Sequence, residues 1–105
     1  MLSRTAEGLF WMARYVERAD NVGRLVEAGR RFESLSNPQS GWGNEWTAIL
    51  IAAGCQETFG DGLDTASAQA AIRHLVLDET NPSSIRSSFA NARGNARAQR
   101  VAVTA

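Results

Sequence analysis

The stretch RTAEGLFWMARYVERADNVGRLVEAGRRFES, residues 4–34, decides the fold. It contains no proline, and its apolar residues recur at helical spacing, with Ser3 or Thr5 as candidate N-cap. A helix of about thirty residues is roughly 45 Å long. A compact globule of this chain length would be only about 33 Å across. The sequence therefore predicts an elongated bundle, a dimer or a part of something larger.

Three further helices follow, and no stretch is typical of a strand. The predicted ranges are about 44–58, 64–77 and 82–104. Asn37-Pro38 and two glycines mark the loop before the second helix, and the sequence FGDGLD marks the next loop. We predict an all-α, four-helix elongated bundle that forms a single domain over residues 1–105.

Composition excludes several classes of function. The 105 residues are 44% hydrophobic and carry no net charge, so overall attraction to nucleic acid or to a membrane is not indicated. Cys55 is the only cysteine, which fits a reducing interior and a small buried side chain. No signal peptide is recognisable, so a cytoplasmic protein is the default expectation. With one histidine and one cysteine, neither a metal site nor a cofactor is predicted.

The first helix carries a charged pair, Glu17-Arg18, whose members point in different directions. On a helical wheel Glu17 shares a polar face with Asn21 and Arg24, whereas Arg18 falls at the border of the apolar face beside Trp11. No acidic residue lies three or four positions from Arg18. We expect its stem to be partly buried. Its guanidinium would then stack on Trp11 and reach water, pair with an acid on another helix, or bind an anion.

The last predicted helix carries a row of arginines beside an apolar stripe. The stripe consists of Ile85, Phe89, Ala92, Ala96 and Val103. Arg86, Arg93, Arg97 and Arg100 share one edge, and Asn91 and Asn95 flank the other side. Clustered arginines repel one another unless anions or carboxylates lie opposite. Acids of the first helix or of the middle segment are the expected partners, and nucleic-acid phosphates are a weaker alternative.

The clearest helix start is Asn81-Pro82-Ser83-Ser84. Asn81 is suited to cap the helix, and Pro82 is suited to its first position. Ser83 and Ser84 are explained by the same chemistry, and no base lies near them in the sequence. The single histidine, His74, is expected to be solvated or hydrogen-bonded. Catalysis by this chain is therefore unsupported by its residues.

Two blocks of the sequence together resemble the bacterial alpha-E domain family. They are LSRTAEGLFWMARYVERADNVGRLV, which includes Glu17-Arg18, and NPSSIRSSFANARGNARAQR. The resemblance implies an all-helical fold. The matching positions are Glu17, Arg18, Asn81, Pro82, Ser83, Ser84, Arg93, Asn95, Arg97 and Arg100. The sequence departs from the family at Gly8 and Gly94, where larger polar residues are expected.

The resemblance also implies a context for the chain. Family members are usually longer, so we expect this chain to be the N-terminal part of a longer domain. They are encoded beside, or fused to, an ATP-grasp ligase and a transglutaminase-like peptidase. This implies a non-catalytic partner or scaffold in a peptide synthesis or modification system. Two alternatives stay open: an anion- or substrate-binding enzyme domain that uses Glu17, Arg18 and the late arginines, or a structural remnant. A homodimer is compatible with all three.

Overall fold

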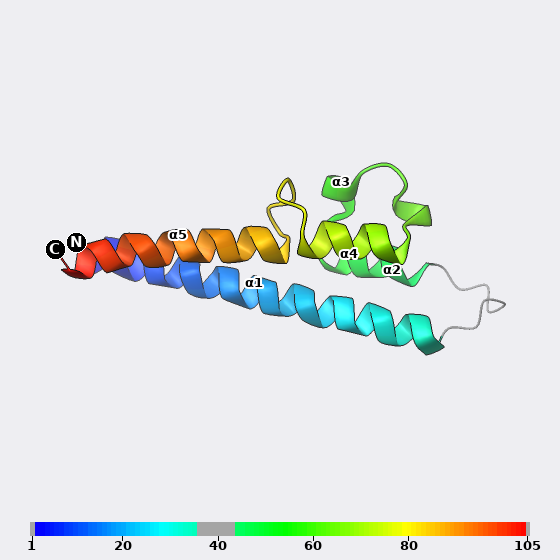
Figure 1. Cartoon of the computed structure of the whole chain (residues 1–105), viewed down its shortest axis with the longest axis horizontal. Helices are drawn as coiled ribbons and strands as arrows, with labels where there is room; N and C mark the ends of the chain where they lie inside the picture. The colour runs from blue at the N-terminus through cyan, green and yellow to red at the C-terminus, as the bar shows by residue number, and fades with distance from the viewer. Residues whose placement is uncertain (1, 36–43, 105) are drawn as a thin grey trace.

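The described residues form an elongated, all-α structure of helices joined by turns, with no strand among them. The structure is a computed structural model that describes residues 2–35 and 44–104, with side chains described for residues 4–35 and 44–98. The helices are α1 (Leu2–Leu35), α2 (Glu45–Ala52), α3 (Gln56–Phe59), α4 (Ala68–Val76) and α5 (Ile85–Thr104), with a short 3₁₀ turn η1 (Leu63–Thr65). The molecule measures 62 × 25 × 18 Å (Figure 1). The all-α, elongated prediction is confirmed, whereas most of the loop predicted around Asn37-Pro38 lies outside the described residues.

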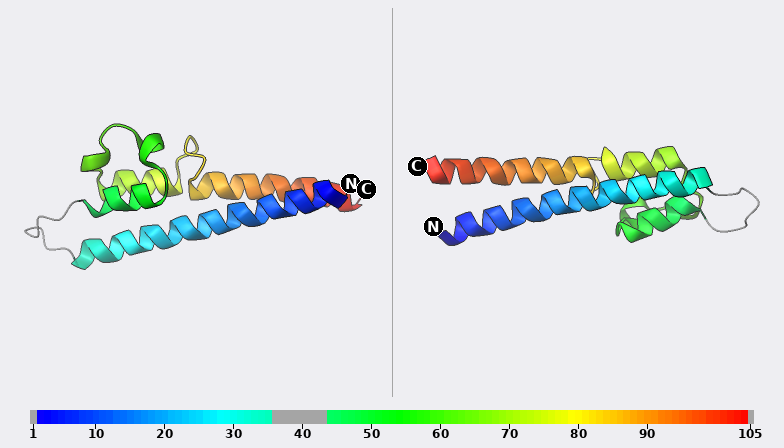
Figure 2. Two further views of the ribbon diagram at one scale, coloured as in Figure 1. Left: turned by 180° about the vertical axis from the view of Figure 1, so that it is seen from behind. Right: turned by 90° about the horizontal axis from the view of Figure 1, so that it is seen from below.

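Helix α1 has 34 residues and runs along most of the length of the molecule, which confirms the long first helix that the sequence predicts. Asp20 pairs with Arg24 at 3.1 Å and Glu27 pairs with Arg31 at 2.8 Å, each one helical turn apart on the exposed surface. The other elements divide this helix into two halves. Its N-terminal half lies beside α5, and its C-terminal half lies beside α2 and α4 (Figures 1 and 2).

The N-terminal half of α1 and α5 form an antiparallel pair, which we call the arm. Both chain ends lie at its tip (Figure 2). Small or short side chains are buried between the two helices: Ala19 and Val22 on α1, and Ser88 and Ala92 on α5. A Cβ atom at Gly23 would lie 3.9 Å from Ile85, an ordinary van der Waals distance, so this glycine lies beside the start of α5. Short side chains at the contact let the two helices approach closely.

The hydrophobic core lies at the other, broader end of the molecule. Trp46, Ile49 and Leu50 of α2 are buried there against Leu75 and neighbouring residues of α4. Gly29 of α1 completes this core, because a Cβ atom at that position would lie 2.7 Å from the Trp46 ring. Ala71 of α4 is also fully buried, and Ala53, Ala68 and Ile72 pack half-buried against the same core.

The helix predicted over residues 44–58 is wrong in its second half. Asn44 does cap α2, since its side chain accepts a hydrogen bond from the Trp46 backbone N–H at 2.9 Å. The helix ends at Ala52, and Gly54 adopts a left-handed φ of 73° that reverses the chain. A single short turn, α3, follows as a separate element.

The helix predicted from Asp64 begins four residues later. Asp64 lies in the 3₁₀ turn η1, and Ser67 caps α4 by accepting a hydrogen bond from the Ala70 N–H at 3.1 Å. Ala66, between the two, is extended with ψ near 129°, which breaks any continuous helix here.

The helix predicted from Pro82 begins at Ile85. Asn81 caps only a turn, because its Oδ1 accepts from the Ser83 N–H at 3.0 Å. Ser84 is the residue that caps α5, since its Oγ accepts from the Ser87 N–H at 3.1 Å. The predicted apolar stripe of this helix is also partly wrong: Ala92 is buried and Ile85 half-buried, but Phe89 and Ala96 are exposed. The side chain of Val103 is outside the described ones.

Candidate functional site

The Glu17–Arg18 pair lies in the middle of the arm, and both residues are exposed. Glu17 pairs with Arg14 on its own helix at 3.3 Å. Our expectation that Arg18 would be partly buried is wrong, because only one helix covers this part of α1. Its guanidinium carbon lies 6.0 Å from the centre of the Tyr15 ring, rather than over Trp11. Among the described residues no ion pair joins Arg18 to an acid.

Three aromatic residues extend from Arg18 toward the tip of the arm. Trp11 lies 6.2 Å from Tyr15 and makes an edge contact with Phe10 at 5.5 Å. Phe10 and Trp11 are 57% and 43% exposed, so these rings face solvent rather than a core. We call Phe10, Trp11, Tyr15 and Arg18 the aromatic–arginine cluster.

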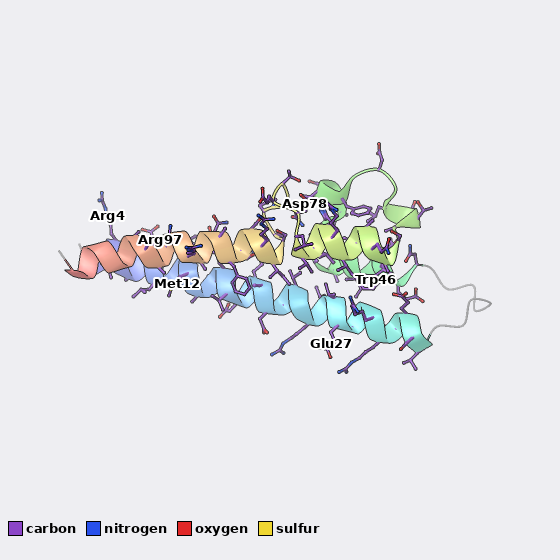
Figure 3. All side chains as sticks on the ribbon, viewed as in Figure 1. Arg4, Met12, Glu27, Trp46, Asp78 and Arg97 are labelled. Carbon is purple, nitrogen blue, oxygen red and sulfur yellow. The ribbon has the colours of Figure 1, made fainter. Side chains whose placement is uncertain are left out.

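Among the described side chains, no ion pair or ring contact joins the arginines of α5 to this cluster. Arg86 pairs with Glu79 of the acidic middle segment at 2.5 Å, as predicted for one member of the row. Arg93 and Arg97 are exposed, and within the described residues neither forms an ion pair. Asn95 donates to the Asn91 carbonyl at 3.1 Å, within its own helix. Figure 3 shows Arg97 on α5 beside the segment of α1 that carries Met12. The side chain of Arg100 lies outside the described ones.

The family of the chain follows from a match over its whole length. A family model described as a predicted alpha-helical domain with a conserved ER motif matches residues 1–105, which is the whole chain. Glu17-Arg18 is the only Glu-Arg dipeptide in the sequence. The chain belongs to the Alpha-E family. No curated protein and no solved structure matches this Alpha-E chain.

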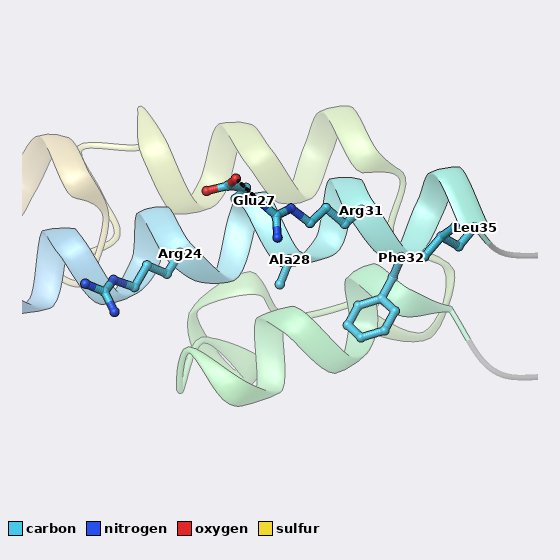
Figure 4. Close-up of a pocket in the computed structure, with 6 residues that line it drawn as sticks. All are labelled: Arg24, Glu27, Ala28, Arg31, Phe32 and Leu35. Atoms are coloured by element: carbon cyan, nitrogen blue, oxygen red, sulfur yellow. Dashed lines mark hydrogen bonds and ion pairs between the residues drawn. The ribbon is translucent and has the colours of Figure 1, made fainter.

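Asn21 and Arg24, the other predicted members of the α1 site, are exposed one and two turns beyond the motif. Arg24 helps to line an open pocket of about 480 Å³ on the C-terminal half of α1 (Figure 4). Its apolar part is formed by Ala28, Phe32 and Leu35, and its charged part by Arg24, Glu27 and Arg31. Because the one acid is paired with Arg31, the pocket shows no arrangement of free acid and base.

The single histidine of this Alpha-E protein lies in a hydrogen-bond line that sequence reasoning missed. His74 is 8% exposed, and its Nε2 lies 2.9 Å from the Thr58 hydroxyl. Its Nδ1 lies 2.9 Å from Asp78, one turn further along the chain. The spacing of His74 and Asp78 was a signal in the sequence, whereas the contact with Thr58 depends on how α3 folds back.

Two further residues complete this line. Asn81 is fully buried and donates to the His74 carbonyl at 2.9 Å. The side-chain hydroxyl and the backbone N–H of Thr80 both donate to Asp78, at 2.6 and 2.9 Å. These bonds, the hydroxyl bond first, together with His74 hold the pKa of Asp78 below its usual value.

A hydroxyl, an imidazole and a carboxylate in line have the composition of a nucleophile relay. Here, however, the Thr58 hydroxyl also lies 3.2 Å from the Cys55 carbonyl, which it can donate to instead. The Phe59 ring packs edge-on against the imidazole at 5.4 Å. We therefore interpret the line as a structural latch that ties α3, α4 and the turn before α5 together.

The described residues contain no group of three or more metal-binding side chains of the His, Cys, Asp or Glu type. They also contain no helix with the length and apolarity required to cross a bilayer.

Proposed function

We propose that this Alpha-E protein is a non-catalytic docking module, and that the aromatic–arginine cluster is the surface through which it binds a partner protein. The observation that carries the proposal is the position of the cluster. Exposed aromatic rings lie together with Arg18, which pairs with no acid among the described residues, at the Glu-Arg motif of the chain.

The composition of the cluster supports a protein partner. Trp, Tyr and Arg are the residue types most enriched among those that carry the binding energy of protein interfaces. Trp11 and Tyr15 offer large, stiff contact surfaces, and Arg18 offers five donors in a fixed planar geometry. A guanidinium beside a ring, with no acid paired to it among the described residues, is well suited to a carboxylate or carbonyl that a partner supplies.

The proposed partners are the ones that the family resemblance suggests, namely an ATP-grasp ligase and a transglutaminase-like peptidase. The chain would then position one of these enzymes in a peptide synthesis or modification system. The proposed setting is the bacterial cytoplasm, where the buried thiol of Cys55 stays reduced.

Affinity capture from the native host tests the proposal. The tagged native protein is compared with Arg18→Ala and with Arg30→Ala as a matched control. Arg30 is an exposed arginine of the same helix, twelve positions away, which at 1.5 Å per residue is about 18 Å. Circular dichroism of each purified variant checks that the helices are intact.

We expect the ligase or the peptidase to be captured by the native protein and by Arg30→Ala, and to be lost with Arg18→Ala. Capture of either enzyme to the same extent by all three forms would place the contact elsewhere on the molecule. Capture of neither enzyme by any form would overturn the proposed function.

A further inference from the structure

The arm carries a second exposed surface, on the flank opposite the aromatic–arginine cluster. Ala19 on α1 and Ser88 on α5 are buried between the two helices. Each of them therefore marks the side of its helix that faces the other helix. At about 100° per residue, Val16 and Leu9 lie roughly 60–80° to one side of Ala19. Trp11 and Arg18 lie on the other side.

The same construction applies to α5. Phe89 and Ala96 lie roughly 80–100° to one side of Ser88. Both helices are right-handed and they run antiparallel, so these two flanks face the same way. Leu9, Val16 and Phe89 are 46%, 47% and 54% exposed, and Ala96 is exposed as well. Together these four residues form one apolar surface across both helices, which we call the arm face.

The arm face is large enough for a specific interface. Helix α5 has 20 residues, and at 1.5 Å per residue it is about 30 Å long. Two helices whose axes are 8–10 Å apart present a surface about 20 Å wide. The whole flank that carries the arm face therefore covers roughly 600 Å² per molecule, or about 1,200 Å² for two copies, which reaches the lower end of stable interfaces.

The charges at its edges suit a second copy of the same chain. Asp20, which pairs with Arg24 on the exposed surface of its own helix, lies just beyond the apolar residues on the α1 edge. Arg93 lies just beyond them on the α5 edge. A two-fold axis parallel to the arm would place α1 of each copy over α5 of the other. It would also bring Asp20 of each copy toward Arg93 of the other, and Arg93 forms no ion pair among the described residues.

We propose that the arm face binds a second copy of the chain, so that the two arms form a four-helix bundle. Burial of Leu9, Val16 and Phe89 would remove from water the largest apolar side chains that are exposed on this flank among the described ones. The aromatic–arginine cluster stays on the outside of such a dimer, free for the partner proposed above.

Light scattering on the full chain over a wide concentration range tests this proposal. We expect a mass of twice the 11.4 kDa chain, falling to one chain with Val16→Glu and with Phe89→Glu. Phe10→Glu is the matched control, since Phe10 is more exposed but lies on the far side of α1 from Ala19. Circular dichroism shows whether each variant keeps its helices.

An exchange of charges tests the orientation. Asp20→Arg and Arg93→Glu should each weaken dimerisation about tenfold or more, because each places like charges across the interface. The double variant should restore dimerisation. The Arg18→Ala variant should remain a dimer, so this proposal and the proposed function can fail independently.

A native protein that stays monomeric at all concentrations would overturn the proposal. So would a dimer that survives both glutamate variants. If the native protein is monomeric and Val16→Glu instead abolishes capture of the ligase or peptidase, the arm face belongs to that partner and not to a second copy.

Discussion

The guanidinium of Arg18 lies 6.0 Å from the centre of the Tyr15 ring, one helical turn back along α1. This contact places the arginine side chain against the ring without using its hydrogen-bond donors. The donors remain available because no described acid pairs with them, whereas Glu17 of the same motif is already paired with Arg14. The two members of the motif therefore differ. Glu17 is held in an ion pair within α1, whereas the hydrogen-bond donors of Arg18 remain available to a partner.

Gly29→Ala should destabilise the fold. The new Cβ would lie 2.7 Å from two atoms of the Trp46 ring and 3.2 Å from Ile49, so the buried ring must move. Overpacking of this kind costs about 1–3 kcal/mol, which exceeds the gain of about 1 kcal/mol from replacing a helical glycine. Urea unfolding measures the difference. Gly94→Ala is the control, since nothing lies within 4 Å of its Cβ, and it should stabilise the protein by about 0.5–1 kcal/mol.

Ser88→Ala should stabilise the protein, by about 1 kcal/mol. The Ser88 hydroxyl is buried between α1 and α5 and is the one buried side-chain oxygen among the described residues without a hydrogen-bond partner. Replacing it removes the penalty of an unpaired polar group and favours the helix.

Ser84 is the matched comparison, because it is equally buried on the same face of the chain, four positions earlier. Its hydroxyl accepts from the Ser87 N–H at 3.1 Å, so Ser84→Ala should cost about 1 kcal/mol. Thermal melts of both variants measure the change in stability, which should be a gain for Ser88→Ala and a loss for Ser84→Ala. Equal losses of stability in the two variants would show that Ser88 does have a partner in solution.

Asp78→Asn should weaken the dependence of the free energy of unfolding on pH in the acid range. The pKa of Asp78 is held below its usual value by the Thr80 hydroxyl, the Thr80 N–H and His74. Its contribution to stability is therefore complete above the unfolded pKa, about 3.9, and is lost as the pH falls through the lower folded value. Urea unfolding at a series of acid pH values tests this. If the native protein and the variant lost stability equally as the pH falls, the hydrogen bonds to Asp78 would be absent in solution.

The sequence predicted the fold class and the long first helix, because α1 contains no proline and its charge pairs are local. It did not predict the breaks after Ala52 and before Ala68. Gly54 could have continued a helix at modest cost, and its left-handed φ is set by how the chain packs. Pro82 was compatible with a first helical position, but the helix begins at Ile85 because Ser84 supplies the cap.

The site was predicted less well than the fold. A helical wheel assigns an inner face to Leu9, Trp11 and Val16, but a pair of helices has only one shared side, so all three are exposed. The same shortage of neighbouring helices leaves Arg18 exposed. The latch around His74 joins residues 16 positions apart through a turn, and no periodicity in the sequence indicates such a contact.

The central claim is that Arg18 is a binding residue, and a titration tests it most directly. The purified chain is titrated against the ATP-grasp ligase or peptidase captured from the host, using native, Arg18→Ala and Arg30→Ala proteins. A residue at the centre of an interface contributes about 2 kcal/mol or more, so Arg18→Ala should raise the Kd at least about thirtyfold, with helix content unchanged. The Arg30→Ala protein should bind like the native one. A Kd for Arg18→Ala that equals the native value would contradict the account.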